Sequence, residues 1–171
     1  MDLVGLGGKL RAGFAKRLVA TLKELKIVCL VSPVMVEEIK GNITALLKRA
    51  PRDRFGPTAE ALRKGDFRTD FVEACFDRIE ILIEDQGIQI DRGFSKYLKP
   101  QFDEAGKNLE DELLSKLQSH YRMFGAAERD AESLFGCYGR RDGIRPSDMY
   151  SSKCFFVTSN DMLAGVGNRF F

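Results

Sequence analysis

Apolar residues recur every three or four positions through several long stretches of the chain, which is the spacing of one face of an α-helix. Leu10, Phe14, Leu18 and Leu22 form the first such face and predict a helix over residues 10–25. Stripes of the same kind predict further helices, which begin after Ser32, at 69, at 107, at 127 and at 161. Those beginning at 69, 107 and 127 are predicted to end at 86, 124 and 138.

Shorter apolar runs have the composition of strands. Residues 27–31 are rich in β-branched side chains and end at Ser32 and Pro33, which predict the cap and first turn of the next helix. Residues 154–158 form a second such run, and residues 88–90 a brief third. Apolar strands alternating with helices predict one α/β domain over residues 1–171, with a parallel sheet flanked by helices in three layers.

Composition and charge restrict the classes of function. The net charge is +2, which is too balanced to indicate nucleic-acid binding by itself. The single histidine, His120, excludes most histidine metal sites. No run reaches the roughly 18 apolar residues of a membrane span, so no membrane association is expected. The cysteines lie far apart in the sequence, which indicates buried free thiols in a reducing, cytoplasmic environment. They are Cys29, Cys75, Cys137 and Cys154.

Acidic residues follow the predicted strands, where ligands bind in open α/β sheets. Glu38 lies one helical turn after strand 27–31, and Asp161 follows strand 154–158. Asp130 lies at the start of the helix that leads to this second strand. Carboxylates drawn from several segments can hold Mg²⁺ or Mn²⁺, which activates water for attack on a phosphodiester. These three acids are therefore the candidate metal ligands.

Three segments carry a resemblance to the PIN-like domains of the PIN nuclease superfamily. Residues 31–39 resemble the segment in which a strand, a Ser and an apolar helical turn lead to an acid. Glu38 takes that acidic position, with Glu37 as the alternative. Residues 129–134 resemble the PIN helix whose first acid binds metal. Residues 155–161 resemble the strand that ends in Thr and is followed by an acid or amide. The resemblance covers residues 25–50 and 107–171, and it leaves 51–106 as an unmatched, helical insertion.

The resemblance implies a metal-dependent endoribonuclease of PIN-like type. Glu38, Asp130 and Asp161 would bind the metal, and Thr158 and Asn160 would orient the catalytic site. Many prokaryotic PIN proteins are toxins of toxin–antitoxin pairs, so the resemblance also implies a protein inhibitor as partner. The chain departs from the family at its beginning, where no apolar strand ending in a metal-binding Asp is present. This departure indicates either a truncated chain or a catalytically degenerate member.

Two alternatives to catalysis stay open. One is a catalytically degenerate PIN-like module that binds RNA or a protein partner without cleaving it. The other is a mostly helical interaction protein in which the predicted strands do not form. A basic loop contains Arg140, Arg141 and Arg145, which would contact an RNA backbone in the functional interpretation and water in the structural one. The sequence leaves the oligomeric state open.

Overall fold

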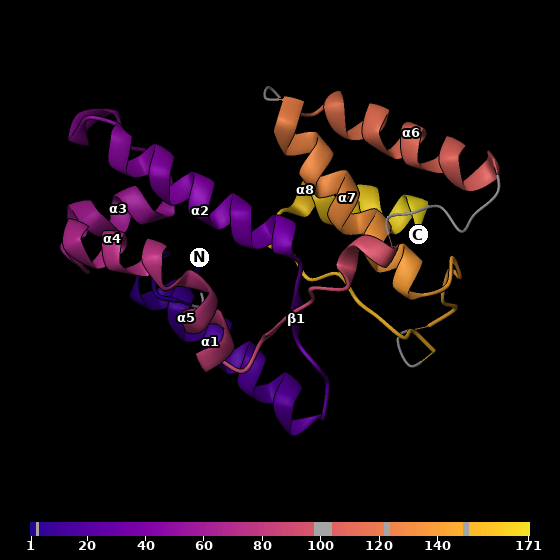
Figure 1. Cartoon of the computed structure of the whole chain (residues 1–171), viewed down its shortest axis with the longest axis horizontal. Helices are drawn as coiled ribbons and strands as arrows, with labels where there is room; N and C mark the ends of the chain where they lie inside the picture. Colours follow the sequence, from indigo (N-terminus) through magenta and orange to yellow (C-terminus); the bar gives the residue numbers. More distant parts are fainter. Residues whose placement is uncertain (3, 98–103, 122–123, 149–150) are drawn as a thin grey trace. The chain divides into compact units, whose positions relative to one another are not determined.

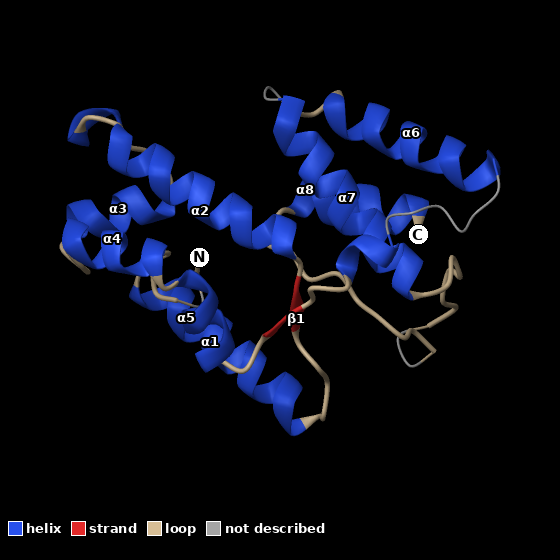
Figure 2. Cartoon of the chain, viewed as in Figure 1, coloured by secondary structure: helices blue, strands red, loops and turns tan. Residues whose placement is uncertain are grey.

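The computed structural model describes residues 1–2, 4–97, 104–121, 124–148 and 151–171 (Figure 1). The contacts between residues divide the chain into two compact units, Met1–Asp91 (unit 1) and Arg92–Phe171 (unit 2). Helix and loop make up nearly all of both units, as Figure 2 shows.

In its described residues, unit 1 consists of five α-helices, one 3₁₀ turn and two short strands. In chain order these are α1 (Lys9–Glu24), β1 (Leu30–Val31), α2 (Pro33–Lys48), η1 (Pro51–Asp53), α3 (Pro57–Lys64), α4 (Thr69–Asp77), α5 (Ile79–Asp85) and β2 (Gln89–Ile90). Helix α2 packs against α4 and α5. Its apolar stripe, which includes Val36, Ile43 and Leu46, is buried as the periodicity predicts.

The start of α2 confirms the predicted cap. Ser32 has an extended backbone, and its hydroxyl accepts a hydrogen bond from the backbone N–H of Met35 at 3.2 Å. Pro33 occupies the first helical position, where its missing N–H costs nothing. Ser32 is itself buried, so this hydrogen bond is shielded from water.

The predicted three-layer α/β sandwich is wrong. In the described residues the only sheet has two strands of two residues each, β1 and β2, which pair in parallel with Leu30 opposite Gln89 and Val31 opposite Ile90. A sandwich needs a wider sheet with helices on both faces. The parallel direction was predicted correctly. Residues 27–29 and 154–158, however, lie in loops rather than strands.

In unit 1, one predicted helix has different boundaries and another buries a different set of residues. The stretch 69–86 is broken at Arg78, which separates α4 from α5. The first helix is present as α1, but Leu10 and Phe14 of its predicted face are exposed, at 87% and 66%. Leu18 and Leu22 are half-buried, and the buried residue of this helix is Val19.

The described part of unit 2 contains a 3₁₀ turn and three α-helices. These are η2 (Phe94–Tyr97), α6 (Glu104–Gln118), α7 (Phe124–Arg140) and α8 (Asp161–Phe170). Helix α7 packs against α6 and η2, and α6 also packs against α8. The core draws side chains from all three helices, namely Leu113, Leu117, Ala127, Ala131, Leu134, Phe135, Leu163 and Val166, together with Phe171.

Glycines allow η2 to approach α7 closely. A Cβ atom at Gly136 would lie 2.2 Å from the ring of Phe94, and one at Gly139 would lie 2.5 Å from the carbonyl oxygen of Tyr97. Neither position could accept a side chain without displacing this turn. Among the described ranges, no helix is both long and apolar enough to cross a lipid bilayer.

Replacing Ser32 by Ala should remove the cap of α2. We expect the free energy of unfolding to fall by about 1 kcal/mol, because the Met35 N–H loses its acceptor in a buried site. Chemical denaturation followed by circular dichroism measures this change. Ser159→Ala is the matched control, since Ser159 is exposed. An equal loss in both variants would contradict the capping role.

Candidate functional site

Two of the residues predicted from sequence, Asp130 and Asn160, meet at the hydroxyl of Tyr121. This residue lies in the connection between α6 and α7, and its hydroxyl is hydrogen-bonded to the Asp130 carboxylate of α7. The Asn160 side-chain amide donates to the same hydroxyl oxygen at 3.1 Å. The Tyr121 O–H therefore donates to Asp130 and accepts from Asn160. We call Tyr121, Asp130 and Asn160 the Tyr121 cluster.

Asn160 has a second role at the start of α8. Its side-chain oxygen accepts a hydrogen bond from the Leu163 backbone N–H at 3.2 Å, which caps the helix. Its own backbone N–H donates to the Thr158 hydroxyl at 3.0 Å. The amide thus uses its oxygen for the helix and its nitrogen for Tyr121. Hydrogen bonds thus connect Thr158 to Asn160 and, through Tyr121, Asn160 to Asp130.

Burial changes the acidity of Asp130. Desolvation raises the pKa of its carboxyl, and the hydrogen bond from Tyr121 and the positive charge of Arg129 oppose that rise. A carboxyl with a raised pKa can exchange protons nearer neutral pH, which general acid–base catalysis uses. Such catalysis also needs a cleft for substrate. Two hollows on the surface of unit 1, described below, are lined by other residues.

The other predicted metal ligands are not part of this cluster. Asp161 is the first residue of α8 and its side chain is exposed. Glu38 belongs to unit 1, where it is half-buried in α2. There Glu38 and Asp2 both lie near the Met1 amine: desolvation lowers the pKa of that amine, and these two carboxylates oppose the change.

No group of three or more His, Cys, Asp or Glu side chains in the described part of the chain is arranged to hold a metal ion. The Mg²⁺ or Mn²⁺ site at Glu38, Asp130 and Asp161 therefore stays a prediction from sequence. The contacts of Asp130 give it a structural task, since its carboxylate helps to join the α6–α7 connection to the start of α8.

The arginines of the predicted RNA-binding loop contact protein groups. Arg145 donates to the Asn168 carbonyl at 3.0 Å and Arg141 to the Phe171 carbonyl at 3.4 Å. Both acceptors lie at the C-terminal end of α8, where the helix dipole favours cations. The Arg140 guanidinium lies over the Tyr97 ring at 4.6 Å from its centroid. These contacts hold the loop, and a role in RNA binding stays a prediction.

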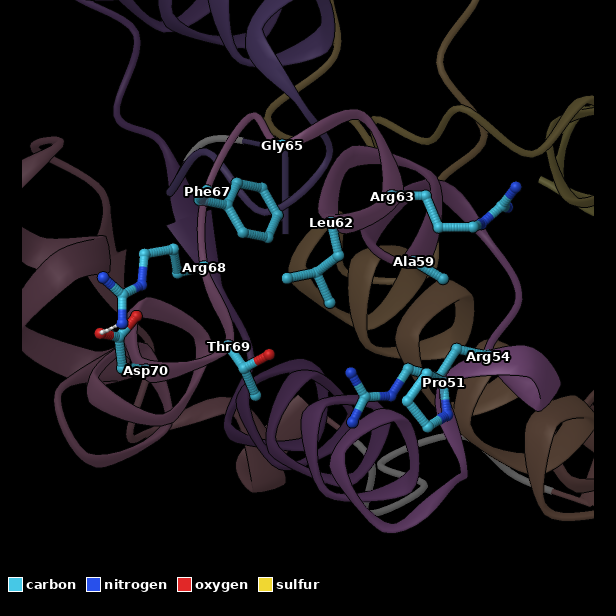
Figure 3. Close-up of a pocket in the computed structure, with 10 residues that line it drawn as sticks. All are labelled: Pro51, Arg54, Ala59, Leu62, Arg63, Gly65, Phe67, Arg68, Thr69 and Asp70. Carbon is cyan, nitrogen blue, oxygen red and sulfur yellow. Dashed lines mark ion pairs between the residues drawn. The ribbon is translucent and has the colours of Figure 1, made fainter.

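Unit 1 contains a site that the sequence analysis did not identify. An open hollow of about 570 Å³, the Arg54 hollow, lies between α3 and the start of α4 (Figure 3). Its lining combines arginines with apolar side chains and comprises Pro51, Arg54, Ala59, Leu62, Arg63, Gly65, Phe67, Arg68, Thr69 and Asp70. Phe67 faces Leu62 in the close-up, and the guanidinium of Arg54 points into the hollow toward Thr69.

A second hollow of about 490 Å³, the Lys9 hollow, adjoins the first. It is lined by Gly5, Lys9, Ala12, Asp66, Phe67, Arg68, Asp70 and Phe71. Phe67, Arg68 and Asp70 belong to both hollows, so residues 67–70 form the wall between them. The sequence signal for this surface was the interleaving of Arg and Phe through residues 49–71, within the segment that matched no motif.

No family model, curated protein or solved structure matches this chain. The resemblance to PIN-like domains therefore rests on the residues quoted for it alone, and the function must be argued from the two sites themselves.

Replacing Tyr121 by Phe tests the Tyr121 cluster. The change deletes one oxygen and leaves the half-buried Asp130 carboxylate without its donor and the Asn160 amide without its acceptor. We expect the free energy of unfolding to fall by about 1–3 kcal/mol. Urea denaturation measures it. Tyr97→Phe is the control, because the Tyr97 ring contacts Arg140 through its face. Unchanged stability in Tyr121→Phe would contradict the proposed linkage.

Asp130→Asn tests the raised pKa. Folding raises the pKa of the Asp130 carboxyl, so this group stabilises the folded state when the pH is below its ordinary pKa of 3.8. The contribution is lost as the pH rises through the pKa of the folded state. Asn carries no charge to desolvate. The melting temperature of the variant relative to wild type should therefore be highest near pH 8 and decline toward pH 4, in a series of thermal melts. Asp161→Asn makes the same charge change on an exposed side chain. A relative melting temperature that rises toward pH 4 would refute the assignment.

Proposed function

We propose that the chain is a binding module for single-stranded RNA, which it holds along the Arg54 hollow and the adjoining Lys9 hollow. The observation that supports this proposal is the position of Arg54, a half-buried cation aimed into an open hollow with an apolar lining. The helix-rich fold agrees with the interpretation as a mostly helical protein, whereas a PIN-like module would need a wider sheet.

The Arg54 guanidinium is positioned to bind an anion. Its Nε donates to the Arg49 backbone carbonyl at 3.1 Å, which fixes the plane of the guanidinium. Its terminal amino groups have no acceptor among the residues that the structure describes, and they face the hollow. A fixed guanidinium loses little entropy when it binds, and its paired N–H groups match the oxygens of a phosphate.

The opposite side of the Arg54 hollow offers further donors. Thr69, whose hydroxyl lines the hollow, is the first residue of α4. The side chain of the N-cap residue, Arg68, makes no capping hydrogen bond. The Phe71 N–H already donates to the Asp70 carboxylate at 3.0 Å, so the N–H groups of Thr69 and Asp70 are the ones that can favour an anion. A phosphate between Arg54 and Thr69 would therefore meet a charged donor on one side and neutral donors on the other.

Aromatic side chains next to these donors suit unpaired bases. Phe67 and Phe71 lie with ring centroids 5.6 Å apart, and both line the Lys9 hollow. Phe71 is 43% exposed, and Phe55 is 69% exposed beneath the Arg49 guanidinium. Bases stack on such rings regardless of sequence, at about 1–3 kcal/mol per base. A basic groove with exposed rings is the usual surface for single-stranded nucleic acid.

Local charge supports the same ligand. Between residues 48 and 70 cations outnumber acids, although the whole chain is nearly neutral. The cations are Lys48, Arg49, Arg52, Arg54, Arg63, Lys64 and Arg68, and the acids are Asp53, Glu60, Asp66 and Asp70. Arg68 is paired with Asp70 at 3.4 Å in an exposed contact that a phosphate could replace at little cost.

Arg54→Gln tests the proposal. We expect the affinity for a fluorescein-labelled oligouridylate of about twelve nucleotides to fall roughly tenfold, which corresponds to the loss of one charged hydrogen-bonding group. Fluorescence anisotropy at low salt measures it. The slope of log K against log salt should also become shallower by about 0.7, since one fewer phosphate is neutralised.

Arg169→Gln is the matched control, because it makes the same charge change on an exposed residue of α8. It should leave the affinity nearly unchanged. Equal losses in the two variants would show nonspecific attraction and would contradict a site at Arg54. Mg²⁺-dependent cleavage of the oligonucleotide that is abolished in Asp130→Asn would instead favour the nuclease predicted from sequence.

A further inference from the structure

Two cysteines that are far apart in the sequence lie together in unit 2. Cys137 belongs to the buried face of α7, and Cys154 lies in the extended segment that leads to α8. Their sulfur atoms are 3.4 Å apart, which is a thiol–thiol contact and not a bond. We propose that Cys137 and Cys154 form a reversible dithiol–disulfide site, which a low-molecular-weight disulfide such as oxidised glutathione closes.

Closing the bond requires a small movement. A disulfide has an S–S length of about 2.05 Å, so the two sulfurs must approach by a little over 1 Å. Cys137 lies in a rigid helix. Cys154 lies in a segment outside any helix or sheet, and an exposed ion pair between Lys153 and Asp142, at 2.5 Å, holds its beginning. The segment can therefore supply the movement without loss of helical or sheet hydrogen bonds.

Exposure determines the order of the two steps. Cys154 is half-exposed, whereas Cys137 is 5% exposed, so the reagent reaches Cys154 first. The Cys154 thiolate attacks one sulfur of oxidised glutathione, forms a mixed disulfide and releases one glutathione thiolate. Cys137 then attacks the Cys154 sulfur and releases the second glutathione. Two protein thiols are oxidised, one disulfide is reduced to two thiols, and the two thiol protons pass to the released glutathiones.

Arg141 assists the second step. Its Nη2 lies 3.9 Å from the Cys137 sulfur, and its Nε is buried with no acceptor among the described residues. The contact with Cys154 and burial raise the pKa of Cys137, and the Arg141 charge opposes them. A mixed disulfide on Cys154 would remove the thiol–thiol hydrogen bond, and the Arg141 guanidinium would then lie beside the attacking Cys137 thiolate and stabilise it.

The disulfide would restrain the segment that connects α7 to α8 in unit 2. It would close the chain between α7 and the segment that ends in Asn160, the cap of α8 and a member of the Tyr121 cluster. A closed loop of this length restricts the unfolded chain and so stabilises the folded one. Oxidation would therefore fix the start of α8 relative to α7.

The experiment incubates the full chain with mixtures of reduced and oxidised glutathione, alkylates the remaining thiols after acid quenching, and maps disulfides by mass spectrometry. We expect a linkage between Cys137 and Cys154, the loss of two alkylatable thiols, and a melting temperature higher by about 5 °C or more than that of the reduced chain. Reduction with excess dithiothreitol should reverse all three changes.

Single substitutions separate the steps. Cys137→Ser should trap glutathione on Cys154, whereas Cys154→Ser should react far more slowly because only the buried Cys137 remains of the pair. Cys29→Ser, in unit 1, should behave as wild type. A wild-type chain that retains glutathione on Cys154, or that forms no linkage between the two residues in excess oxidised glutathione, would overturn the proposal. The mapping uses the wild-type chain and therefore holds even if a variant misfolds.

Discussion

Helix α7 is buried along much of its length, and the polar groups of unit 2 are arranged around it. Its apolar residues fill the core with those of α6 and α8, and its glycines allow η2 to lie directly against it. Two groups on this helix reach outward to the segment before α8: Asp130 through Tyr121 and Asn160, and Cys137 through Cys154. Hydrophobic burial thus places the helix, and hydrogen bonds and a thiol contact attach the chain that follows it.

Unit 1 uses its polar residues in a different way. Its acids and bases lie mostly on the surface, and its core is apolar. The Arg54 hollow combines a tethered guanidinium, a helix start without a side-chain cap, and neighbouring phenylalanines that remain accessible. Phe67 also packs against the apolar core of unit 1, and a hydrogen bond ties Arg54 to Arg49, yet each of these features would contribute to binding an unpaired nucleic-acid strand. The polar groups of the Tyr121 cluster bond to one another, whereas the Arg54 guanidinium faces an open hollow, and this difference favours unit 1 as the proposed binding site.

Part of the candidate site in unit 2 could be predicted from sequence. The order Asp130, Thr158, Asn160 suggested residues that meet, and they do meet, because a helix start capped by Asn160 lies beside α7. Tyr121 could not be picked out from sequence, because it lies within the stretch 107–124 that the apolar periodicity predicts to be helical. Its hydroxyl bonds to both Asp130 and Asn160. A pattern of acids cannot distinguish a metal site from a hydrogen-bonded one, because both place carboxylates at the ends of elements.

The sequence by itself determined where most helices lie, since the 3.6-residue period and the Ser32 and Asn160 caps are local properties of the chain. Tertiary structure alone decided whether apolar runs became strands. Residues 154–158 have strand composition but no described neighbour to pair with, and a strand exists only when a second chain segment supplies its hydrogen bonds. For the same reason only the fold could bring Cys137 to Cys154 and aim Arg54 into a hollow. Such proximity depends on packing between distant segments, which no local pattern encodes.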